Sequence, residues 1–380
     1  MLDTPSRANA RANDQPISAA TSSNNQIFLG GKNNPLLAPR GVHLVGGRLF
    51  VSDTGQNRVF IWNELPTDDQ QEPDVVLGQI AKADTGRNAG GKVSASSLMY
   101  PSGIWSDGER LIVSDAWNHR VLIWNTLPTK DGQPADVVVG QKDFTGNEPN
   151  VDGIGATPSA QSLNWPYGVT SDGERLFIAD TGNRRVLVYD KIPTENYTAA
   201  DGVIGKNGFE DRDYDHTQPI WPYSVKLGPK GELAITDTQY YRVLLFAHWS
   251  DSLHPRPRPE YPTIIGQNTI DDNGQNQFRW FPEPYTLNWC YDTCFHKKGL
   301  FVADTGNSRV LRFDQLPTVN NTPANSLLGQ ATFNVGIENR NSIHATPETM
   351  YWPFHLDIED DLMAIADTGN HRIILHPIND

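Results

Sequence analysis

Six short stretches of the chain share one arrangement of apolar and polar positions. In each, an apolar, β-branched run ends at an aspartate, a turn follows, and an arginine five residues after the aspartate opens a second apolar run. Short runs of this kind bounded by turn residues predict strands, so each stretch should form a β-hairpin. The stretches read LFVSDTGQNRVFIW, LIVSDAWNHRVLIW, LFIADTGNRRVLVY, LAITDTQYYRVLLF, LFVADTGNSRVLRF and MAIADTGNHRIILH.

The stretches recur at a nearly fixed period, and each has room for two more strands. The six aspartates lie 57 to 67 residues apart, at Asp53, Asp115, Asp180, Asp237, Asp304 and Asp367. A run such as WPYGVTS (165–171) precedes the hairpin, and a run such as VVLGQ follows it after an LPT-type turn. Four strands at this spacing are typical of a propeller blade, so the sequence predicts an all-β, six-bladed β-propeller of four-stranded blades. We number the strands of a blade first to fourth in chain order.

The two ends of the chain predict how the ring closes. The sixth copy ends at its third strand, HRIILHPIND, whereas residues 26–31 (QIFLGG) match the fourth-strand pattern. We therefore expect the N-terminal strand to complete the last blade and so to remove an open sheet edge. Residues 25–380 are predicted to form this single domain. Residues 1–24, which are polar and carry no apolar core, are predicted to be a disordered arm.

The recurring Asp, the Asn-containing turn and the Arg-Val that follows resemble the repeat of the NHL family of six-bladed propellers over residues 25–380. The fourth copy departs most, with Gln239-Tyr240-Tyr241 in its turn. The resemblance implies the fold but leaves function open, because this family includes amidating lyases, lactonase-like hydrolases, RNA binders and protein-interaction scaffolds.

The resemblance does not extend to the zinc site of the amidating lyases. Those enzymes bind zinc through histidines placed directly after the proline that opens several first strands. None of the six corresponding positions in this chain is a histidine, so neither that zinc site nor the lyase activity is expected, and we expect no metal or cofactor. This slot holds Arg40, Ser102, Tyr167, Tyr223, Tyr291 and Phe354.

Charge and cysteine usage narrow the possible partners. The net charge is −14, and the connections between blades, which should gather on one face with the Asp-Arg turns, carry 8 Lys/Arg against 13 Asp/Glu. An acidic face repels phosphate, so we expect no nucleic-acid binding. No stretch approaches the roughly 18 apolar residues of a membrane span.

Cys290 and Cys294 are four residues apart on one predicted strand, about 13 Å, which is too far for a disulfide. Free thiols favour a cytoplasmic location.

The Asp-Arg pairs are interpreted as structural, because six identical copies serve an architecture better than a chemistry. Each Asp is expected to cap its own turn and to pair with its Arg. The tryptophans before the proline slot (Trp165, Trp221, Trp289 and Trp352) are interpreted as packing between blades.

Candidate chemistry lies instead in the first strands, which should line the central channel. The slot after the proline carries the cation Arg40 and four aromatic residues, Tyr167, Tyr223, Tyr291 and Phe354, which suits a ligand with an anionic end and a flat or apolar body. The next slot changes from glycine in three blades to Ser224, Asp292 and His355 in the other three.

Three interpretations of these polar residues are open. They could form a Ser-His-Asp relay, but equivalent slots of neighbouring blades should be about 10 Å apart. A polar patch that contacts a ligand and a purely structural lining remain alternatives.

Two other segments have simpler interpretations. Residues 210–216 (EDRDYDH) alternate Asp as calcium loops do but lack the Gly and the closing Glu, which favours a solvated acidic loop. Residues 254–259 (HPRPRP) should form a stiff extended loop or a docking strip.

Together these observations predict a non-catalytic binding or scaffold propeller. Its acidic, aromatic-rich loop face would meet a protein or a small-molecule ligand. The alternative is a hydrolase or lyase with its site at the channel mouth around Arg40, Asp292 and His355.

Overall fold

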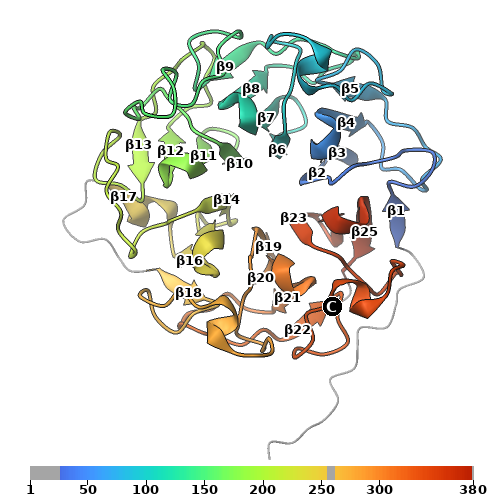
Figure 1. The fold of residues 1–380 in the computed structure, drawn as a ribbon, viewed down its shortest axis with the longest axis vertical. Helices are drawn as coiled ribbons and strands as arrows, with labels where there is room; N and C mark the ends of the chain where they lie inside the picture. Colours follow the sequence, from blue (N-terminus) through green and yellow to red (C-terminus); the bar gives the residue numbers. More distant parts are fainter. Residues whose placement is uncertain (1–25, 255–261, 379–380) are drawn as a thin grey trace, which may run out of the picture.

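The computed structural model describes residues 26–254 and 262–378. Within them, six β-sheets stand in a ring around a central channel (Figure 1), which confirms the six-bladed β-propeller. The predicted N-terminal arm lies outside the described residues, and so do residues 255–259 of the proline-rich strip. No helix among the described residues has the length and apolar character needed to cross a membrane.

Each blade runs from an inner first strand to an outer fourth strand. The strands of blades 1 to 3 are β2 (Gly41–Val45), β3 (Arg48–Asp53), β4 (Arg58–Trp62) and β5 (Val75–Leu77); β6 (Pro101–Ser106), β7 (Leu111–Asp115), β8 (Arg120–Trp124) and β9 (Val137–Val139); and β10 (Pro166–Ser171), β11 (Leu176–Asp180), β12 (Arg185–Tyr189) and β13 (Gly202–Ile204). Those of blades 4 to 6 are β14 (Pro222–Leu227), β15 (Leu233–Asp237), β16 (Arg242–Phe246) and β18 (Thr263–Ile265); β19 (Asp292–His296), β20 (Gly299–Asp304), β21 (Arg309–Phe313) and β22 (Ser326–Leu328); and β23 (Pro353–Glu359), β24 (Leu362–Asp367), β25 (Arg372–Pro377) and β1 (Ile27–Leu29).

Short 3-10 helices punctuate the connections. The turn between the second and third strands of each blade holds η1 (Thr54–Gln56), η3 (Ala116–Asn118), η4 (Thr181–Asn183), η5 (Thr238–Tyr240), η8 (Thr305–Asn307) and η10 (Thr368–Asn370). Three connections between blades hold η2 (Arg87–Gly90), η7 (Gln275–Phe278) and η9 (Glu338–Asn341). After the third strand of blade 4, η6 (Trp249–Ser252) leads to β17 (Leu253–His254). Strand β17 pairs with β13 and so adds a fifth strand to the sheet of blade 3.

The ring closes as the sequence predicted. Strand β1 pairs antiparallel with β25 and places Phe28 opposite Ile374. The blade therefore contains strands from both ends of the described chain (Figure 1). Apolar faces of neighbouring blades pack on one another to form the core, as Phe177 of β11 does with Val225 and Ile235 of blade 4. Each blade is thus held by both neighbours.

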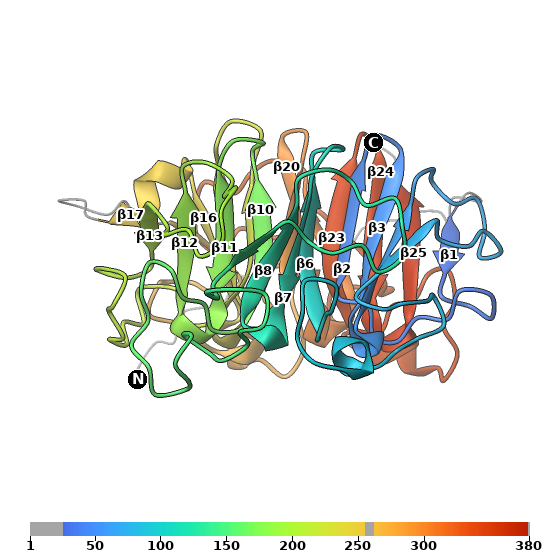
Figure 2. The ribbon, with the colours of Figure 1, turned by 90° about the horizontal axis from the view of Figure 1, so that it is seen from above.

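The strands of every blade run between two faces of the ring (Figure 2). The turns between second and third strands share one face with the connections between blades, because the first strand starts there and the second returns to it. We call this the loop face.

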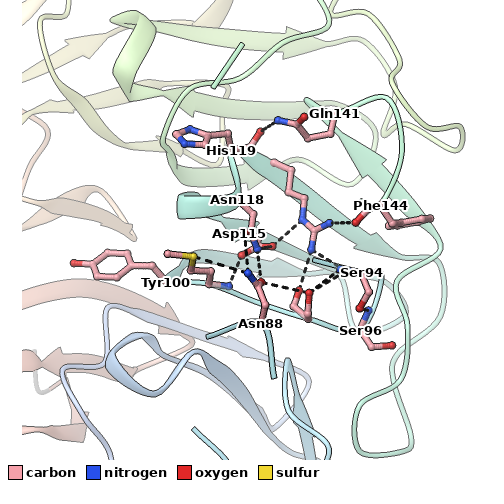
Figure 3. Close-up of polar contacts among 12 residues, drawn as sticks. Asn88, Ser94, Ser96, Tyr100, Asp115, Asn118, His119, Gln141 and Phe144 are labelled. Carbon is pink, nitrogen blue, oxygen red and sulfur yellow. Dashed lines mark hydrogen bonds and ion pairs between the residues drawn. The ribbon is translucent and has the colours of Figure 1, made fainter. Parts of the chain in front are cut away.

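The Asp-Arg pairs are structural units on the loop side, one of which is shown in Figure 3, and all their side chains are buried except Arg372, which is 13% exposed. In blade 2, the Asp115 carboxylate accepts from Arg120 Nε at 2.8 Å, and Arg120 also donates to the carbonyls of Phe144 and Ser94. The expected capping is wrong, because the Asp115 side chain caps none of the η3 N–H groups; it accepts instead from Met99 N at 2.7 Å. The unit therefore fastens the connections on both sides of its blade to the turn.

Candidate functional site

The side chains of the six first strands fill the channel in two layers. The aromatic layer lies toward the loop face and consists of Arg40, Tyr100, Tyr167, Tyr223, Tyr291 and Phe354. The ionic layer lies further along the same strands and consists of His43, Ser224, Lys226, Asp292, His355 and Asp357. The first layer is the slot singled out in the sequence, joined by Tyr100.

Irregular pairing helps to place the aromatic layer. The register between first and second strands shifts at Pro166/Gly168, Pro222/Ser224 and Pro353/His355, and Tyr167, Tyr223 and Phe354 are the extra residues. A β-bulge re-aims the side chain of its extra residue. Here the bulges direct three aromatic rings into the channel.

The rings of the aromatic layer contact one another across the channel. Tyr223 stacks on Tyr167 with centroids 4.6 Å apart and meets Tyr291 edge-on at 4.6 Å. Phe354 lies 4.0 Å from Tyr291. Tyr223 and Phe354 are each 4% exposed, whereas Tyr167 and Tyr291 are half-buried. Tyr223 and Phe354 therefore form a floor, and Tyr167 and Tyr291 remain accessible to a ligand.

Arg40 is a cation without a counter-charge. Its guanidinium lies 4.0 Å above the ring of Phe354 and 5.2 Å from that of Tyr100. Among the described residues, no carboxylate reaches it, its Nε is buried without a hydrogen-bond partner, and Nη1 makes a long 3.5 Å contact with the Tyr223 hydroxyl. A guanidinium has five donors. Apart from the contact with Tyr223, the described residues offer these donors no hydrogen-bond acceptor.

The tyrosines around Arg40 stay protonated. Burial raises the pKa of Tyr167 to about 12 and raises the pKa values of Tyr100 and Tyr291 well above their usual range. Neutral phenols can donate hydrogen bonds, so three hydroxyls and one guanidinium offer donors in one small region. The layer suits an anionic group attached to an apolar body.

The second slot differs between blades because the spacing of the first strands differs. A Cβ on Gly41 would lie 2.0 Å from the Ser102 carbonyl oxygen, and one on Gly103 would lie 2.6 Å from that of Tyr167. These strands approach too closely for any side chain. Between blades 4, 5 and 6, the same slot holds Ser224, Asp292 and His355, all buried.

Asp292 is the centre of the ionic layer. Its carboxylate accepts from the Ser224 hydroxyl, from Leu356 N at 2.8 Å, and lies 3.5 Å from Lys226 Nζ. Burial raises the pKa of Asp292, and the Lys226 charge opposes that rise. Burial alone would lower the pKa of Lys226, but Asp292 and Asp357 outweigh it and the net direction is upward. These contacts clamp blades 4, 5 and 6 together.

A second pair extends this network to the first two blades. His43 Nδ1 lies 3.0 Å from Asp357 Oδ2, and His43 Nε2 lies 2.8 Å from the Ser106 carbonyl oxygen. A carbonyl only accepts, so Nε2 donates, and Nδ1 donates to the carboxylate as well. Although burial would raise it, the pKa of Asp357 is lowered because His43 and other donors face it. In this layer each of the two carboxylates thus faces a nitrogen side chain, Lys226 for Asp292 and His43 for Asp357.

The distance argument against a catalytic relay is corrected by the structure. Side chains reach across the blades, so Ser224 bonds to Asp292, and His355 Nδ1 lies 3.5 Å from the same carboxylate. The order of contact still opposes a relay, because the aspartate stands between serine and histidine and the imidazole does not contact Ser224. His355 Nδ1 accepts from Val42 N at 3.4 Å, and burial lowers its pKa, so the imidazole is neutral. All three residues are out of direct reach of a ligand at the loop face.

The interpretation of the tryptophans as packing between blades holds in part. Trp165 contacts His119 and Trp221, and Trp289 contacts Tyr241, in each case across a blade boundary, but the rings are not fully covered. Trp165, Trp289 and Trp352 are 40%, 43% and 43% exposed, around the loop-side mouth of the channel. The backbone there is left-handed, with φ of 50°, 45° and 54°. Their rings therefore stand at the surface as an aromatic rim.

The acidic loop is not arranged as a calcium cage. Asp211 accepts from Asn207 N and Asp213 N, and Asp215 from Thr217 N. Among the described residues, no three His, Cys, Asp or Glu side chains form a group able to hold a metal. Cys290 and Cys294 are both buried free thiols.

Sequence reasoning missed Tyr100, His43, Lys226 and Asp357. Tyr100 occupies the position before the proline, where other blades have tryptophan, and it extends away from the Asp115 unit in Figure 3. His43, Lys226 and Asp357 are polar residues on predicted inner strands, at alternate positions that should face a neighbouring blade. This alternation of polar residues on inner strands was the signal in the sequence that could have identified these three residues.

Comparisons with known proteins support the fold and no more. No family model matches the chain, and no curated protein matches it. It is similar to hydrazine synthase from Kuenenia stuttgartiensis (12% identity, TM-score 0.51, 91% of this chain and 97% of that chain). It is also similar to a protein of unknown function from Bacteroides thetaiotaomicron VPI-5482 (14% identity, TM-score 0.50, 90% of this chain and 70% of that chain). A weaker likeness is to virginiamycin B lyase from Staphylococcus aureus (13% identity, TM-score 0.43, 93% and 98%). At these identities the chain is assigned to the β-propeller fold, with family and activity left open.

Proposed function

We propose that the chain is a non-catalytic binding propeller whose ligand site is the aromatic layer at the loop-side mouth of the channel. The ligand carries an anionic group, held by Arg40 and the neighbouring tyrosine hydroxyls, on a flat or apolar body that contacts Tyr167 and Tyr291. Ser224, Asp292 and His355 position the strands beneath it. The repeat itself supports placing the chain among NHL-type propellers.

The observation that carries the proposal is the missing partner of Arg40. Leaving a buried or half-buried charge without a counter-ion costs free energy, and proteins usually pair such groups. In the ionic layer of the same channel, Lys226 lies beside Asp292 and His43 beside Asp357. Among the described residues of this channel, Arg40 faces aromatic rings and no carboxylate, which is how a binding residue differs from a structural one.

The experiment titrates the full chain with benzoate and phenyl phosphate, using benzamide as a neutral match for benzoate, and follows tyrosine and tryptophan fluorescence. We expect saturable binding of both anions and at least about tenfold weaker binding of benzamide, the size of a charge-assisted hydrogen-bond contribution. Arg40→Gln should remove the preference for the anions, and Arg40→Lys should keep part of it.

The matched control is Arg87→Gln, which removes an exposed arginine beside Trp117 on the same face. This variant should bind benzoate like the unchanged chain. Equal affinity for benzoate and benzamide, or no effect of Arg40→Gln, would remove the basis of the proposal.

The enzymatic alternative is weaker on the same geometry. Its residues would be Arg40, Asp292 and His355, but Asp292 is fully buried under its own partners and His355 is neutral and buried. Neither can reach a ligand at the mouth without breaking the ionic layer. We therefore propose binding without catalysis.

A further inference from the structure

The exposed apolar side chains of the protein are concentrated on one face. Among the described residues, 14 large hydrophobic side chains are exposed, and all except Val319 lie on the loop face or the rim of its channel mouth. Val319 belongs to a connection between third and fourth strands. Scattered exposed apolar residues are normal, whereas their concentration on one face marks an interaction surface.

One connection holds the densest part of this surface. In the segment between β18 and β19, Phe278, Trp280 and Phe281 are 84%, 96% and 68% exposed within four residues. No other connection among the described residues has three exposed aromatic side chains. We call these three residues the aromatic tip.

The backbone at Phe278 is unfavourable for its side chain. Its φ is 59°, and the equivalent residues of two other connections, Gly90 and Asn341, have φ of 73° and 65°. The equivalence follows from shared hydrogen bonds, since Asn88 N, Asn276 N and Asn339 N each bond to the carbonyl 10 or 11 residues further on. Glycine and asparagine accept this conformation readily, and a phenylalanine does not. An exposed ring in strained backbone has no evident role in stability and favours a role in contact.

The acid excess of the loop face lies in the same sector. The connections 207–220 and 268–288 together carry 7 Asp/Glu and 2 Lys/Arg, and the other four connections carry 6 of each. The two connections touch, because His216 Nε2 lies 2.8 Å from Asp271 Oδ1. The aromatic tip and the acid excess therefore belong to the same two touching connections, with Arg279 inside the tip, and the other four connections carry no net charge.

We propose that this sector docks a protein segment that carries Lys or Arg among apolar side chains. The aromatic tip supplies apolar contact and faces for cation–π contact with Lys or Arg, and the surrounding carboxylates supply the complementary charge. Nucleic acids and anionic membranes share the charge of this sector and are repelled by it. The surface is on the same face as the proposed ligand site but uses different residues, so it is independent of Arg40.

The experiment measures binding of the full chain to two fluorescently labelled amphipathic peptides by anisotropy. One peptide is built from Leu and Lys, and the other has Glu at every Lys position. We expect binding of the Lys peptide only, weakened at least about tenfold in the variant Phe278→Ser/Trp280→Ser/Phe281→Ser, as for residues at the centre of an interface. Glu210→Gln/Asp213→Asn should weaken binding less and reduce its salt dependence.

Matched controls separate this surface from the rest of the face. Ile80→Ser and Ile343→Ser remove side chains that are 77% and 91% exposed on other connections and should leave the affinity unchanged, as should Arg40→Gln. The tip variant should still bind benzoate, so the two proposals can fail separately.

Four outcomes would overturn the proposal. They are binding of the Glu peptide, equal binding by the tip variant, tip-dependent flotation with zwitterionic phosphatidylcholine vesicles in place of peptide binding, and tip-dependent self-association in sedimentation.

Discussion

The Asp-Arg units and the channel slots are both repeated six times, but only the units are repeated without change in chemistry. Every unit has an Asp carboxylate 2.7–2.9 Å from its Arg Nε. The slot after the first-strand proline instead holds a cation, a serine, three tyrosines and a phenylalanine. We call the ring of blades with its Asp-Arg units the frame. What stabilises the frame is needed in every blade, whereas a ligand contacts only one end of the ring.

Charge pairing separates the two regions more sharply than residue type does. In the Asp-Arg units and in the ionic layer, each cation has its carboxylate. Among the described residues of the aromatic layer, Arg40 has none. Breaking a pair should therefore destabilise the protein strongly, and removing Arg40 should not.

The largest expected effect comes from opening the frame. Deleting residues 1–31 removes β1, leaves the backbone edge of β25 unpaired and exposes apolar surface of Leu29 and its neighbours. Open edges of this kind pair with other chains, so we expect aggregation and a large drop in Tm. Deleting residues 1–22 retains β1 and should be harmless. Thermal melts with light scattering compare the two, and equal melting temperatures would contradict the prediction.

The next largest effect comes from one Asp-Arg unit. Asp180→Asn leaves Arg185 buried without a carboxylate and disturbs the bond to Asn164 N. Loss of one partner of a buried pair costs about 3–5 kcal/mol. Urea unfolding should show this loss for Asp180→Asn and almost none for Asp190→Asn, whose residue is exposed. A small loss in Asp180→Asn would mean that the frame tolerates unpaired charge as the channel mouth does.

The floor of the aromatic layer should behave like core. The 4% exposure of Tyr223, between Tyr167 and Tyr291, favours packing at this position, and Tyr223→Ala tests it. We expect a loss of about 3 kcal/mol in unfolding free energy, as for buried aromatic truncations. Tyr167→Ala, at a half-buried position, should cost less and weaken benzoate binding more. The reverse order would move the ligand site deeper into the channel.

How far the sequence predicted these regions follows from how each is encoded. The blade pattern and the closure by residues 26–31 depend on strand periodicity, which is local, and both are confirmed. The Asp side chain accepts a hydrogen bond from a backbone N–H 16 residues earlier, such as Met99 N for Asp115. This bond lies outside the strand pattern and was missed. The ionic layer joins residues up to 314 positions apart, as between His43 and Asp357. Spacing along one strand gives no signal for such contacts.

A smaller effect should appear in the acid range. His119 Nδ1 accepts from Trp165 N at 3.0 Å, and burial lowers the pKa of His119 to about 4. A histidine whose pKa is lower in the folded state contributes stability above about pH 6.5 that is lost as the pH falls toward 4. Asn57 holds the equivalent place in blade 1, with φ of 55°, and accepts from Tyr100 N. His119→Asn should therefore keep the hydrogen bond from Trp165 N. Between pH 7 and pH 4, the free energy of unfolding should fall by about 2 kcal/mol less in this variant than in the unchanged chain. An unchanged acid limb in urea unfolding at several pH values would contradict this assignment.

The smallest effect on stability is expected at Arg40, and it is the sharpest test of the comparison. Arg40→Gln removes a cation that contacts Phe354 and Tyr100 but has no carboxylate among the described residues. The loss of cation–π contact, about 1 kcal/mol, is offset by relief of an uncompensated charge in a dry environment. The free energy of unfolding should therefore change by no more than about 1 kcal/mol, in either direction. Urea unfolding of Arg40→Gln beside Asp180→Asn measures both regions under one condition. If Arg40→Gln cost as much as Asp180→Asn, Arg40 would belong to the frame, and its free donors would not identify a ligand site.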